Sequence, residues 1–458
     1  MNALSGEAIF FGGEHFDGKF TRFYNDLFRC ELKKSELHWK RTQSQNTPTP
    51  RSSHQAVITS AQQMFLFGGE FGTSKETKFF HYKDFWMLDL KTFAWEDLTA
   101  TVKPLPPPRS GHRMAIWKHI IAMFGGFYDA SAGDTKYFDD LWLFDTREYK
   151  WTKVDWLNDA NNRPSPRSGF QFVPLESGIL LYGGYCQVKG KNGEYEGQVL
   201  NDIWLLKLDP VDVKKSRWER KKISGSAPQP SPRSGPASCA GRGGRSFYLF
   251  GGVQDEAVGD ELLSGTCLND FWEYSLERNQ WRQISISEGV VPRYNANMFL
   301  IGSSLIVSGG IYEREDRQYV LDDAYCINNV EKMDKFTLVR KLSVDLESWE
   351  GSASEASESS GNEFDSDSDS DSSDSGDSED SDFEDDAKQQ NQQQHSNHPQ
   401  IFPGQSLKDY FAENQEYWTQ QAQAAYPTTT NAKQLRGEAF QMAQQAYNEH
   451  QMMQMMLK

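Results

Sequence analysis

Six short apolar segments, each ending in Gly-Gly, recur along the first two thirds of the chain. Their first glycines are Gly12, Gly68, Gly125, Gly183, Gly251 and Gly309. The spacing between successive first glycines is 56, 57, 58, 68 and 58 residues. A period of this length with several short apolar runs indicates a repeat protein whose units stack on one another.

Each period contains three further positions of fixed chemistry. An acidic residue leads into a short aromatic segment at Asp26, Asp84, Asp140, Asp202, Asp270 and Asp323. The next segment carries an aromatic residue that we expect to pack between neighbouring units, at Trp39, Trp95, Trp151, Trp218, Trp281 and Phe336. A Pro-Arg pair precedes five of the Gly-Gly pairs by 16 to 18 residues, with its arginine at Arg51, Arg109, Arg167, Arg233 and Arg293. Four short strands per period in radial repetition predict an all-β fold, a six-bladed β-propeller.

These motifs resemble the kelch repeat over roughly residues 1–342. The segments Tyr24–Leu27, His81–Trp86 and Arg109–Met114 are similar to those of the kelch domain-containing protein 4 family and its fungal relatives. The resemblance implies a Pro-Arg strand ahead of the first Gly-Gly, but only 11 residues precede Gly12. We therefore expect blade 1 to lack most of its innermost strand, and the sequence to be incomplete at its N-terminus.

A linker of polar composition follows the repeats over residues 343–405. Within it, Glu355 to Asp386 contain 15 acidic residues and no Lys or Arg. So little apolar surface cannot offset the entropy of ordering the chain, so we expect this acidic tract to be disordered. Ser366 and Ser375 lie in acidic contexts that resemble acidophilic-kinase sites, and the tract could bind basic proteins.

Residues 406–458 carry a helical pattern. Ser406 to Asp409 has the form of a capping box, and apolar residues follow at helical spacing on either side of Pro427. This pattern predicts a small α-helical hairpin with one aromatic face. We expect that face to dock on the propeller or on a partner, because so short a hairpin cannot bury it alone. The resemblance implies that this tail is the helical domain of unknown function found in many relatives.

The charge distribution excludes some functions. The chain has a net charge of −17, of which the acidic tract carries −15, so the first 354 residues are almost neutral. A nearly neutral body argues against direct nucleic-acid binding, which needs a cationic surplus. No apolar run is long enough to span a bilayer and no signal peptide opens the sequence. We expect a cytoplasmic protein, with the nucleus as a second compartment and no membrane partner.

Signals for catalysis are weak. The five cysteines lack Cys-x-x-Cys spacing, the nine histidines are scattered, and Gly-x-Ser-x-Gly is absent. We therefore expect neither a metal nor a cofactor and favour a non-catalytic protein–protein interaction module. A substrate receptor of a ubiquitin ligase is the first alternative, because kelch propellers often serve there, although no BTB or F-box-like region accompanies the repeats. An enzyme with a site in the propeller channel is the least favoured.

The loops after Gly-Gly are the best candidates for binding. From the second glycine to the following acidic residue they span 13 to 18 residues, where a hairpin needs about two to five. They share one side of the disc with the Pro-Arg segments, and their aromatic and cationic residues suit protein binding. The candidate residues are Lys78, Phe79, Phe80, His81, Tyr82, Tyr128, Tyr137, Tyr185, Lys189, Lys191, Tyr294, Asn295, Arg109 and Arg167.

Each candidate also has a structural interpretation. An arginine in the same register of five blades commonly holds a loop or a neighbouring blade in place. We expect the histidines that follow it, His54 and His112, to be structural as well. The aromatic loop residues could also pack against one another. Tyr294 and Asn295 break the repeat where the three preceding blades carry Ser-Gly, which favours a functional role for them.

Overall fold

The computed structural model divides the chain into two compact units, Met1–Trp349 and Glu350–Lys458. The first consists of strands and the second of helices, which confirms the predicted propeller followed by a helical C-terminal region. The structure describes residues 2–4, 6–34, 36–73, 79–129, 135–155, 162–190, 195–223, 227–258, 262–286, 289–314, 317–328, 336–343, 346, 398–402, 405–429 and 431–456.

Six antiparallel sheets of four strands form the blades of the first unit, within the described residues. Blade 1 contains β1 (Asn2–Leu4), β2 (Glu7–Phe16), β3 (Thr21–Lys33) and β4 (Glu36–Thr42). Blade 2 contains β5 (Gln55–Ile58), β6 (Gln63–Phe67), β9 (Phe85–Asp89) and β10 (Ala94–Asp97). Blade 3 contains β11 (Arg113–Trp117), β12 (Ile120–Phe124), β15 (Leu141–Asp145) and β16 (Lys150–Val154). Each blade is thus a meander that follows the chain order.

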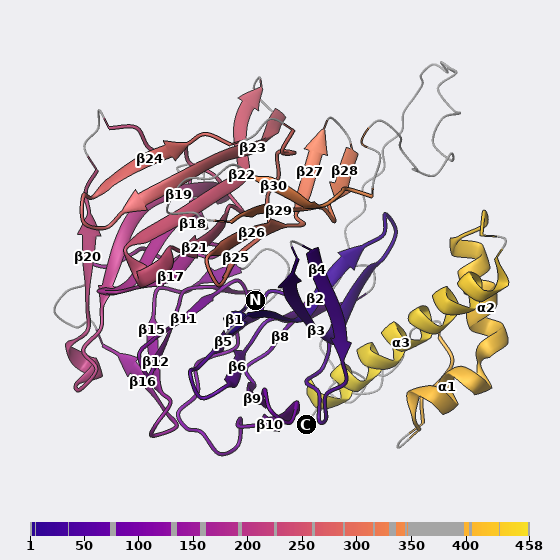
Figure 1. The fold of residues 1–458 in the computed structure, drawn as a ribbon. Helices are drawn as coiled ribbons and strands as arrows, with labels where there is room; N and C mark the ends of the chain where they lie inside the picture. The colour runs from indigo at the N-terminus through magenta and orange to yellow at the C-terminus, as the bar shows by residue number, and fades with distance from the viewer. Residues whose placement is uncertain are drawn as a thin grey trace, which may run out of the picture. The chain divides into compact units, whose positions relative to one another are not determined.

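The remaining three blades repeat this order. Blade 4 contains β17 (Gln171–Leu175), β18 (Gly178–Lys189), β19 (Tyr195–Lys207) and β20 (Arg217–Lys221). Blade 5 contains β21 (Ala237–Ala240), β22 (Ser246–Val258), β23 (Leu262–Ser275) and β24 (Gln280–Ile284). Blade 6 contains β25 (Asn297–Ile301), β26 (Ser304–Ser308), β29 (Ala324–Ile327) and β30 (Thr337–Arg340). The first strands of the blades gather around a common centre (Figure 1).

The post-Gly-Gly loops form β-hairpins of their own. In blades 1, 4 and 5 the second and third strands continue past Gly-Gly with a register shift, whereas blades 2, 3 and 6 form separate two-stranded sheets. Those sheets are β7 (Glu70–Gly72) with β8 (Phe79–His81), β13 (Phe127–Asp129) with β14 (Thr135–Tyr137), and β27 (Ile311–Arg314) with β28 (Arg317–Val320). Short 3-10 turns η1 (Val213–Lys215) and η2 (Arg242–Gly244) lie in other connections.

Gly-Gly is required by backbone conformation and by close approach. Gly68 has φ +65°, and a Cβ atom there would lie 2.7 Å from the carbonyl oxygen of Arg109. Gly69 has φ +92° and would meet the carbonyl oxygen of Ser52 at 2.5 Å. A side chain at either position would therefore strain the backbone, and it would displace the entry segment of the following blade at Gly68 or of the same blade at Gly69.

In blades 2 to 6, a large aromatic residue from the outer strand packs on the preceding blade. The ring centroids lie 4.9 Å apart for Trp95 and Phe11, and 5.3 Å apart for Trp151 and Phe85. The equivalent residues in blades 4, 5 and 6 contact the preceding blade in the same way, and all five are buried: Trp95, Trp151, Trp218, Trp281 and Phe336. These contacts confirm the predicted packing role for blades 2 to 6.

Trp39 departs from this pattern and corrects our expectation for blade 1. Its side chain is 42% exposed, and its ring lies 4.8 Å from Phe10 of its own blade. The reason lies in blade 6, which presents Ser308 and Ala324 where blade 2 presents Phe67 and Phe85. The seam between blades 6 and 1 is packed instead by a smaller cluster, Ala8, Cys30, Phe299, Ile301, Ile306 and Cys326.

β1 corrects the expectation for the inner strand of blade 1. It occupies the innermost position and pairs with β2 from Asn2↔Ile9 to Leu4↔Glu7. Gly6, with φ +110°, lies in the tight turn that makes this short hairpin possible. Blade 1 therefore has an inner strand of three residues, where the other inner strands have four or five.

The second unit contains three helices rather than the predicted two: α1 (Leu407–Glu413), α2 (Gln415–Ala425) and α3 (Ala432–Met456). Asn414 separates the first two, because its side-chain amide donates to the Tyr410 carbonyl and its backbone N–H donates to the Phe411 carbonyl. The Ser406 hydroxyl accepts from the Asp409 N–H at 3.2 Å, as expected for a cap.

The aromatic face of these helices is covered within the unit itself. Tyr410 is 0% and Trp418 1% exposed, and both belong to one core with Ala422 and Ala443. The expectation that this face must dock elsewhere to be buried is therefore wrong. The third helix supplies the small side chains that let the aromatic rings approach closely.

The repeat tryptophan should contribute more to stability in blade 2, where it is buried, than in blade 1, where it is partly exposed. Trp95→Ala should lower the free energy of unfolding by about 3–5 kcal/mol, because it leaves a buried cavity. Trp39→Ala should cost less than about 1 kcal/mol, because that side chain is partly solvated. Chemical denaturation of both variants measures the difference. Equal losses of unfolding free energy would show that Trp39 is packed as tightly as Trp95.

Candidate partner-binding face

A buried arginine–aspartate pair recurs in blades 2 to 6. In blade 3, the Arg109 guanidinium donates to Asp140 at 2.6 and 2.9 Å and to the Gly125 carbonyl at 2.9 Å. The indole of Trp142 donates to the same carboxylate at 2.8 Å. The other pairs are Arg51–Asp84, Arg167–Asp202, Arg233–Asp270 and Arg293–Asp323, and an indole donates to the carboxylate in all of them except the last. Burial alone would raise the pKa of Asp140, but hydrogen bonds and the charge of Arg109 outweigh it and lower that pKa.

The same arginine also joins its blade to the preceding one. The Arg109 N–H donates to the Tyr82 carbonyl at 3.3 Å, and its own carbonyl accepts from the Gly69 N–H at 3.0 Å. Arg109 is 0% and Arg167 1% exposed. Neither guanidinium is available to a partner, so both residues are removed from the candidate face as structural residues.

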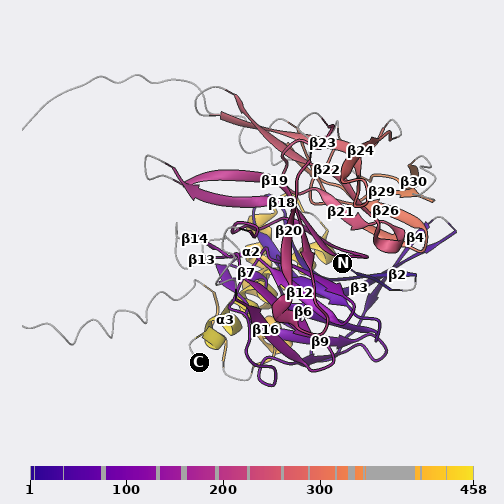
Figure 2. The ribbon, with the colours of Figure 1, turned by 90° about the vertical axis from the view of Figure 1, so that its left-hand side faces the viewer.

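The hairpins of blades 2 to 6 are each anchored to the entry segment of their own blade. The residue after the repeat arginine exchanges two backbone hydrogen bonds with the first residue past Gly-Gly. For Ser52 and Glu70 both are 2.9 Å, and Ser110 pairs with Phe127 and Ser168 with Tyr185 in the same way. The hairpins of β18–β19 and β22–β23 extend from the same side of the disc as β13–β14 (Figure 2). We call this side the hairpin face.

Neighbouring hairpins contact one another through aromatic rings. Phe23 and Phe71 lie 5.1 Å apart between blades 1 and 2, and Tyr137 and Tyr185 lie 6.3 Å apart between blades 3 and 4. Tyr128, Tyr137 and Tyr185 are half-buried by such contacts. They combine a fixed position with partial exposure, which suits side chains that anchor a partner.

The segment His81–Tyr82 is structural, which corrects its place among the binding candidates. The Tyr82 ring is stacked under the Arg51 guanidinium, 3.9 Å from its carbon, and its hydroxyl donates to the Pro50 carbonyl at 2.9 Å. The His81 side chain is 1% exposed. In contrast, Phe79 is 38% exposed and Phe80 is half-buried, so these two remain candidates.

Tyr294 and Asn295 also have structural explanations. Asn295 has φ 53° at a position where Gly111 has φ 62° and Gly235 φ 60°, and asparagine tolerates this left-handed conformation better than most residues. Its N–H donates to the Gly235 carbonyl at 2.7 Å. The Tyr294 hydroxyl donates to Glu313 on β27. Tyr294 thus holds the last hairpin in place, whereas Asn295 joins the entry segments of blades 5 and 6 and has an exposed side chain.

Lys189 is exposed on β18, beside Val188, which is 41% exposed, and near Tyr195, which is 56% exposed. Lys78 and Lys191, and the predicted phosphorylation sites Ser366 and Ser375, lie outside the described residues. Of the candidate residues, Phe79 and Lys189 are therefore exposed and Phe80, Tyr128, Tyr137 and Tyr185 half-buried on the hairpin face, and Tyr195 at a hairpin tip is exposed beside them.

A buried polar cluster beneath the hairpins was missed by the sequence analysis. The His81 Nε2 accepts from the Asp129 N–H at 3.1 Å, so its Nδ1–H donates to the Ser110 hydroxyl at 2.7 Å, and Glu70 lies 3.6 Å away. This set does not fit serine hydrolysis, because Ser110 is 0% exposed and the base nitrogen is already occupied. The sequence signal for this cluster was Glu70, an acidic residue directly after Gly-Gly.

Burial raises the pKa of Glu70 to about 7, with hydrogen bonds from Ser53 and Ser110 opposing this shift and the charges of Glu14 and Asp129 adding to it. Burial also lowers the pKa of His81. Burial therefore disfavours the charged forms of both Glu70 and His81, and Glu70 changes its charge near neutral pH.

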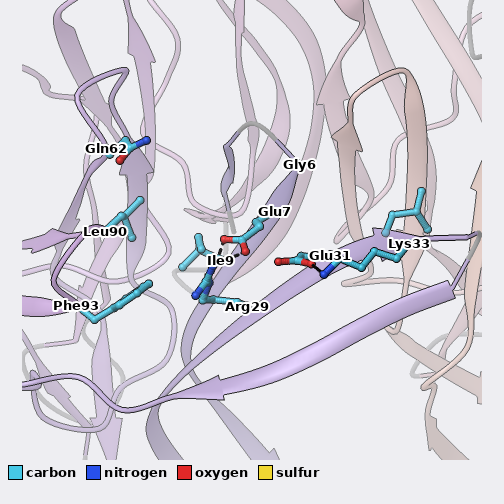
Figure 3. A pocket seen from close by; sticks show the side chains of 10 residues that line it. Gly6, Glu7, Ile9, Arg29, Glu31, Lys33, Gln62, Leu90 and Phe93 are labelled. Carbon is cyan, nitrogen blue, oxygen red and sulfur yellow. Dashed lines mark hydrogen bonds and ion pairs between the residues drawn. The ribbon is translucent and has the colours of Figure 1, made fainter.

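A cavity between blades 1 and 2, of about 500 Å³, opens away from the hairpin face. Figure 3 shows Arg29 directed toward Glu7 and Lys33 toward Glu31 along the wall of this cavity that β2 and β3 form. Arg29 donates to Glu7 at 3.0 Å through Nε, lies over the Phe93 ring at 5.0 Å, and Lys33 pairs with Glu31. Both carboxylates have their cations within the protein, so this cavity offers no uncompensated charge.

Two negative findings concern the described part of the chain. No group of three or more His, Cys, Asp or Glu residues there is arranged to hold a metal ion. No helix there is long and apolar enough to cross a membrane.

Comparison with known proteins agrees with the geometry. The model of the KLHDC2/KLHL20/DRC7 kelch-repeats domain matches residues 1–229 and 190–343. The chain belongs to this kelch-repeat family.

Curated relatives of this kelch-repeat chain are distant. Host cell factor of Drosophila melanogaster is 25% identical over 54% of the chain and 16% of that protein. A probable serine/threonine-protein kinase of Dictyostelium discoideum is 26% identical over 54% of the chain and 19% of that protein. An F-box/kelch-repeat protein of Arabidopsis thaliana is 27% identical over 48% of the chain and 46% of that protein. The match covers less than half the length of each relative.

Tyr82 is buried and Phe79 is exposed, although both follow the same Gly-Gly pair, so their substitutions should differ in effect. Tyr82→Ala should lower the free energy of unfolding by about 3–5 kcal/mol, because it removes a buried ring and exposes the Arg51 charge to a cavity. Phe79→Ala should change it by less than about 1 kcal/mol. Thermal and urea unfolding compare the two, and a similar loss for Phe79→Ala would place that ring in the core.

The raised pKa of Glu70 predicts that the stability of the protein depends on pH. Its folded pKa of about 7 exceeds the ordinary value of 4.5, so the folded state binds more protons between these values. The contribution of Glu70 to the stability of the fold is fully present below pH 4.5 and is lost as the pH rises through about 7. Glu70→Gln should therefore raise the Tm relative to the parent protein at pH 8 and change it little at pH 5.

The matched control for Glu70→Gln is Glu176→Gln, whose parent side chain is 68% exposed. This control should follow the parent protein at every pH. Parallel melting profiles for Glu70→Gln and the parent protein would refute the raised pKa.

Proposed function

We propose that the chain is a non-catalytic module that binds a protein partner through the hairpin face. The observation that carries this proposal is the combination of half-exposed tyrosines and exposed Phe79, Lys189 and Tyr195 on hairpins whose bases are fixed to the blades. Rigid aromatic side chains lose little conformational entropy on binding, and clusters of them form most interface hot spots.

Membership of a kelch-repeat family supports binding of proteins rather than catalysis. We also propose that the chain is related to the kelch domain-containing protein 4 family and that it acts in the cytoplasm and the nucleus. Its acidic tract would bind basic proteins. Phosphorylation at Ser366 and Ser375 would make that tract more negative and strengthen such recognition.

A substrate receptor of a ubiquitin ligase is the second candidate. The relative named an F-box/kelch-repeat protein favours it, because a kelch propeller there shares a chain with an F-box. Co-purification of a cullin adaptor with the full chain would support this candidate, and capture of partners without any such adaptor would favour a simple interaction module.

Affinity capture from cell extract tests the hairpin face. The double variant Phe79→Ala/Tyr195→Ala should weaken capture of a specific partner at least tenfold, because it removes two exposed aromatic side chains, while the Tm changes by less than about 2 °C.

The matched control for this test is Val211→Ala/Arg245→Ala. These two residues are 94% and 81% exposed, and they lie in strand connections on the side of the disc opposite the hairpin face. This control should capture partners as the parent protein does. Undiminished capture by the hairpin variant, or equal loss in the control, would contradict the proposed face.

A further inference from the structure

One position in the hairpins provides contacts between neighbouring blades. It is the residue that pairs with the first residue past Gly-Gly, and we call it the junction residue. Since the side chains at this position differ in size and polarity from blade to blade, the fold of a blade does not prescribe which residue stands there. The six junction residues are Phe23, His81, Tyr137, Val199, Cys267 and Val320.

Four junction residues contact the hairpin of the next blade. Phe23 and Tyr137 make the aromatic contacts between hairpins described above. The Cys267 sulfur accepts from the N–H of Glu313 in blade 6 at 3.4 Å. His81 combines ring contacts and hydrogen bonds with blade 3. Junction residues therefore link the hairpins in series from blade 1 to blade 4, and they also link blade 5 to blade 6.

The His81 side chain is directed into the neighbouring blade. Its backbone belongs to blade 2, but its Nδ1 is bonded to the Ser110 hydroxyl and its Nε2 to the Asp129 N–H, which both belong to blade 3. The imidazole ring also lies 5.0 Å from the Tyr128 ring and 5.6 Å from the Phe127 ring. Since the side chain is 1% exposed, His81 does not contact a partner itself and influences one only through blade 3.

Tyr128 lies between two backbone groups that are held in place. The residue before it, Phe127, exchanges two hydrogen bonds with Ser110, at 2.8 and 2.9 Å. The residue after it, Asp129, is held by His81. A side chain whose backbone is already fixed loses less conformational entropy when a partner binds, so such fixation increases affinity. His81 supplies the second of the two points that fix Tyr128.

We propose that His81 is a positioning residue of the hairpin face. It holds the blade 3 hairpin through Asp129, so that Tyr128 meets a partner in one arrangement. This inference rests on the proposed function, because it requires that Tyr128 belongs to the surface that binds a partner.

Amide hydrogen exchange of the full chain, followed by NMR at pH 7, tests the junction without a partner. The variant is His81→Leu, which removes the acceptor; valine at the junction position of blades 4 and 6 shows that an aliphatic side chain is compatible with the fold. The Asp129 N–H should then exchange about tenfold faster than in the parent protein. Unchanged exchange at Asp129 would overturn the proposal.

Two other amides of the same variant are internal controls. The Phe127 N–H donates to the Ser110 carbonyl, and the Glu313 N–H donates to the sulfur of Cys267. Neither bond involves His81, so both amides should keep their exchange rates within about threefold. Faster exchange at all three positions would show general loosening of the propeller and would contradict a local role for His81.

His81→Gln separates the hydrogen bond from packing. The glutamine amide oxygen accepts hydrogen bonds, so it can replace Nε2 as the acceptor for the Asp129 N–H. Slow exchange at Asp129 should return to within about threefold of the parent protein. If His81→Gln exchanged as fast as His81→Leu, the bond to Asp129 would not be what holds the hairpin, and the positioning role would be refuted.

The link to Tyr128 is tested by affinity. The probe is a purified protein that the parent chain captures and that Phe79→Ala/Tyr195→Ala does not. His81→Leu should weaken its binding about fivefold and Tyr128→Ala about tenfold. The double variant His81→Leu/Tyr128→Ala should bind no more weakly than Tyr128→Ala alone, because His81 acts through that ring.

The outcomes separate this inference from the proposed function. A double variant whose loss is the product of the two single losses would show that His81 does not act through Tyr128, and would overturn the inference while the binding face stands. Failure of the proposed function would appear differently, as undiminished capture by Phe79→Ala/Tyr195→Ala, with the Asp129 amide still released in His81→Leu.

Discussion

The buried pair of arginine and aspartate in blades 2 to 6 is the interaction on which the propeller depends. A charge placed in the interior is tolerated only when its partner and its remaining hydrogen bonds are in place, and removing one partner of such a pair costs about 3–5 kcal/mol. In blade 3 the two carboxylate oxygens of Asp140 and the Gly125 carbonyl meet this requirement for Arg109. Because the arginine backbone also bonds to the preceding blade, each pair fixes a junction as well as a blade.

This arrangement makes a rigid base for variable hairpins. Gly-Gly ends the blade sheet with two residues in left-handed or related conformations, and the chain then leaves the disc as a new hairpin. Backbone bridges such as Ser110↔Phe127 anchor the hairpin at its first residue. Residues beyond that anchor can change without disturbing the blades, and this is why the exposed aromatic residues suit recognition while Tyr82, below the anchor, belongs to the core.

Departures from the repeat have two different causes. Trp39 is exposed because Ser308 and Ala324 leave no aromatic slot at the seam of blades 6 and 1. Asn295 differs from glycine yet keeps the left-handed conformation of its position. Both are accounted for by packing or backbone geometry.

The sequence by itself determined the repeat, the number of blades and the side of the disc on which the long loops emerge. Periodicity survives in the one-dimensional pattern because every blade needs the same glycines, aspartate and aromatic residue for the same local reasons. It also indicated helices after residue 406, since capping and spacing are local signals. Their number was misjudged, because the break at Asn414 depends on the hydrogen bonds that its side chain and backbone make.

Only the tertiary structure decided which candidate residues are exposed and which are buried. Arg109, Arg167, His81 and Tyr82 have the composition of a binding site, but their burial comes from segments 15 or more residues away that the pattern does not identify. The same holds for Trp39, whose exposure depends on residues of blade 6, nearly 300 positions later. Local physics fixes which elements form, whereas exposure and charge compensation depend on contacts between distant segments, and these exist only once the ring is assembled.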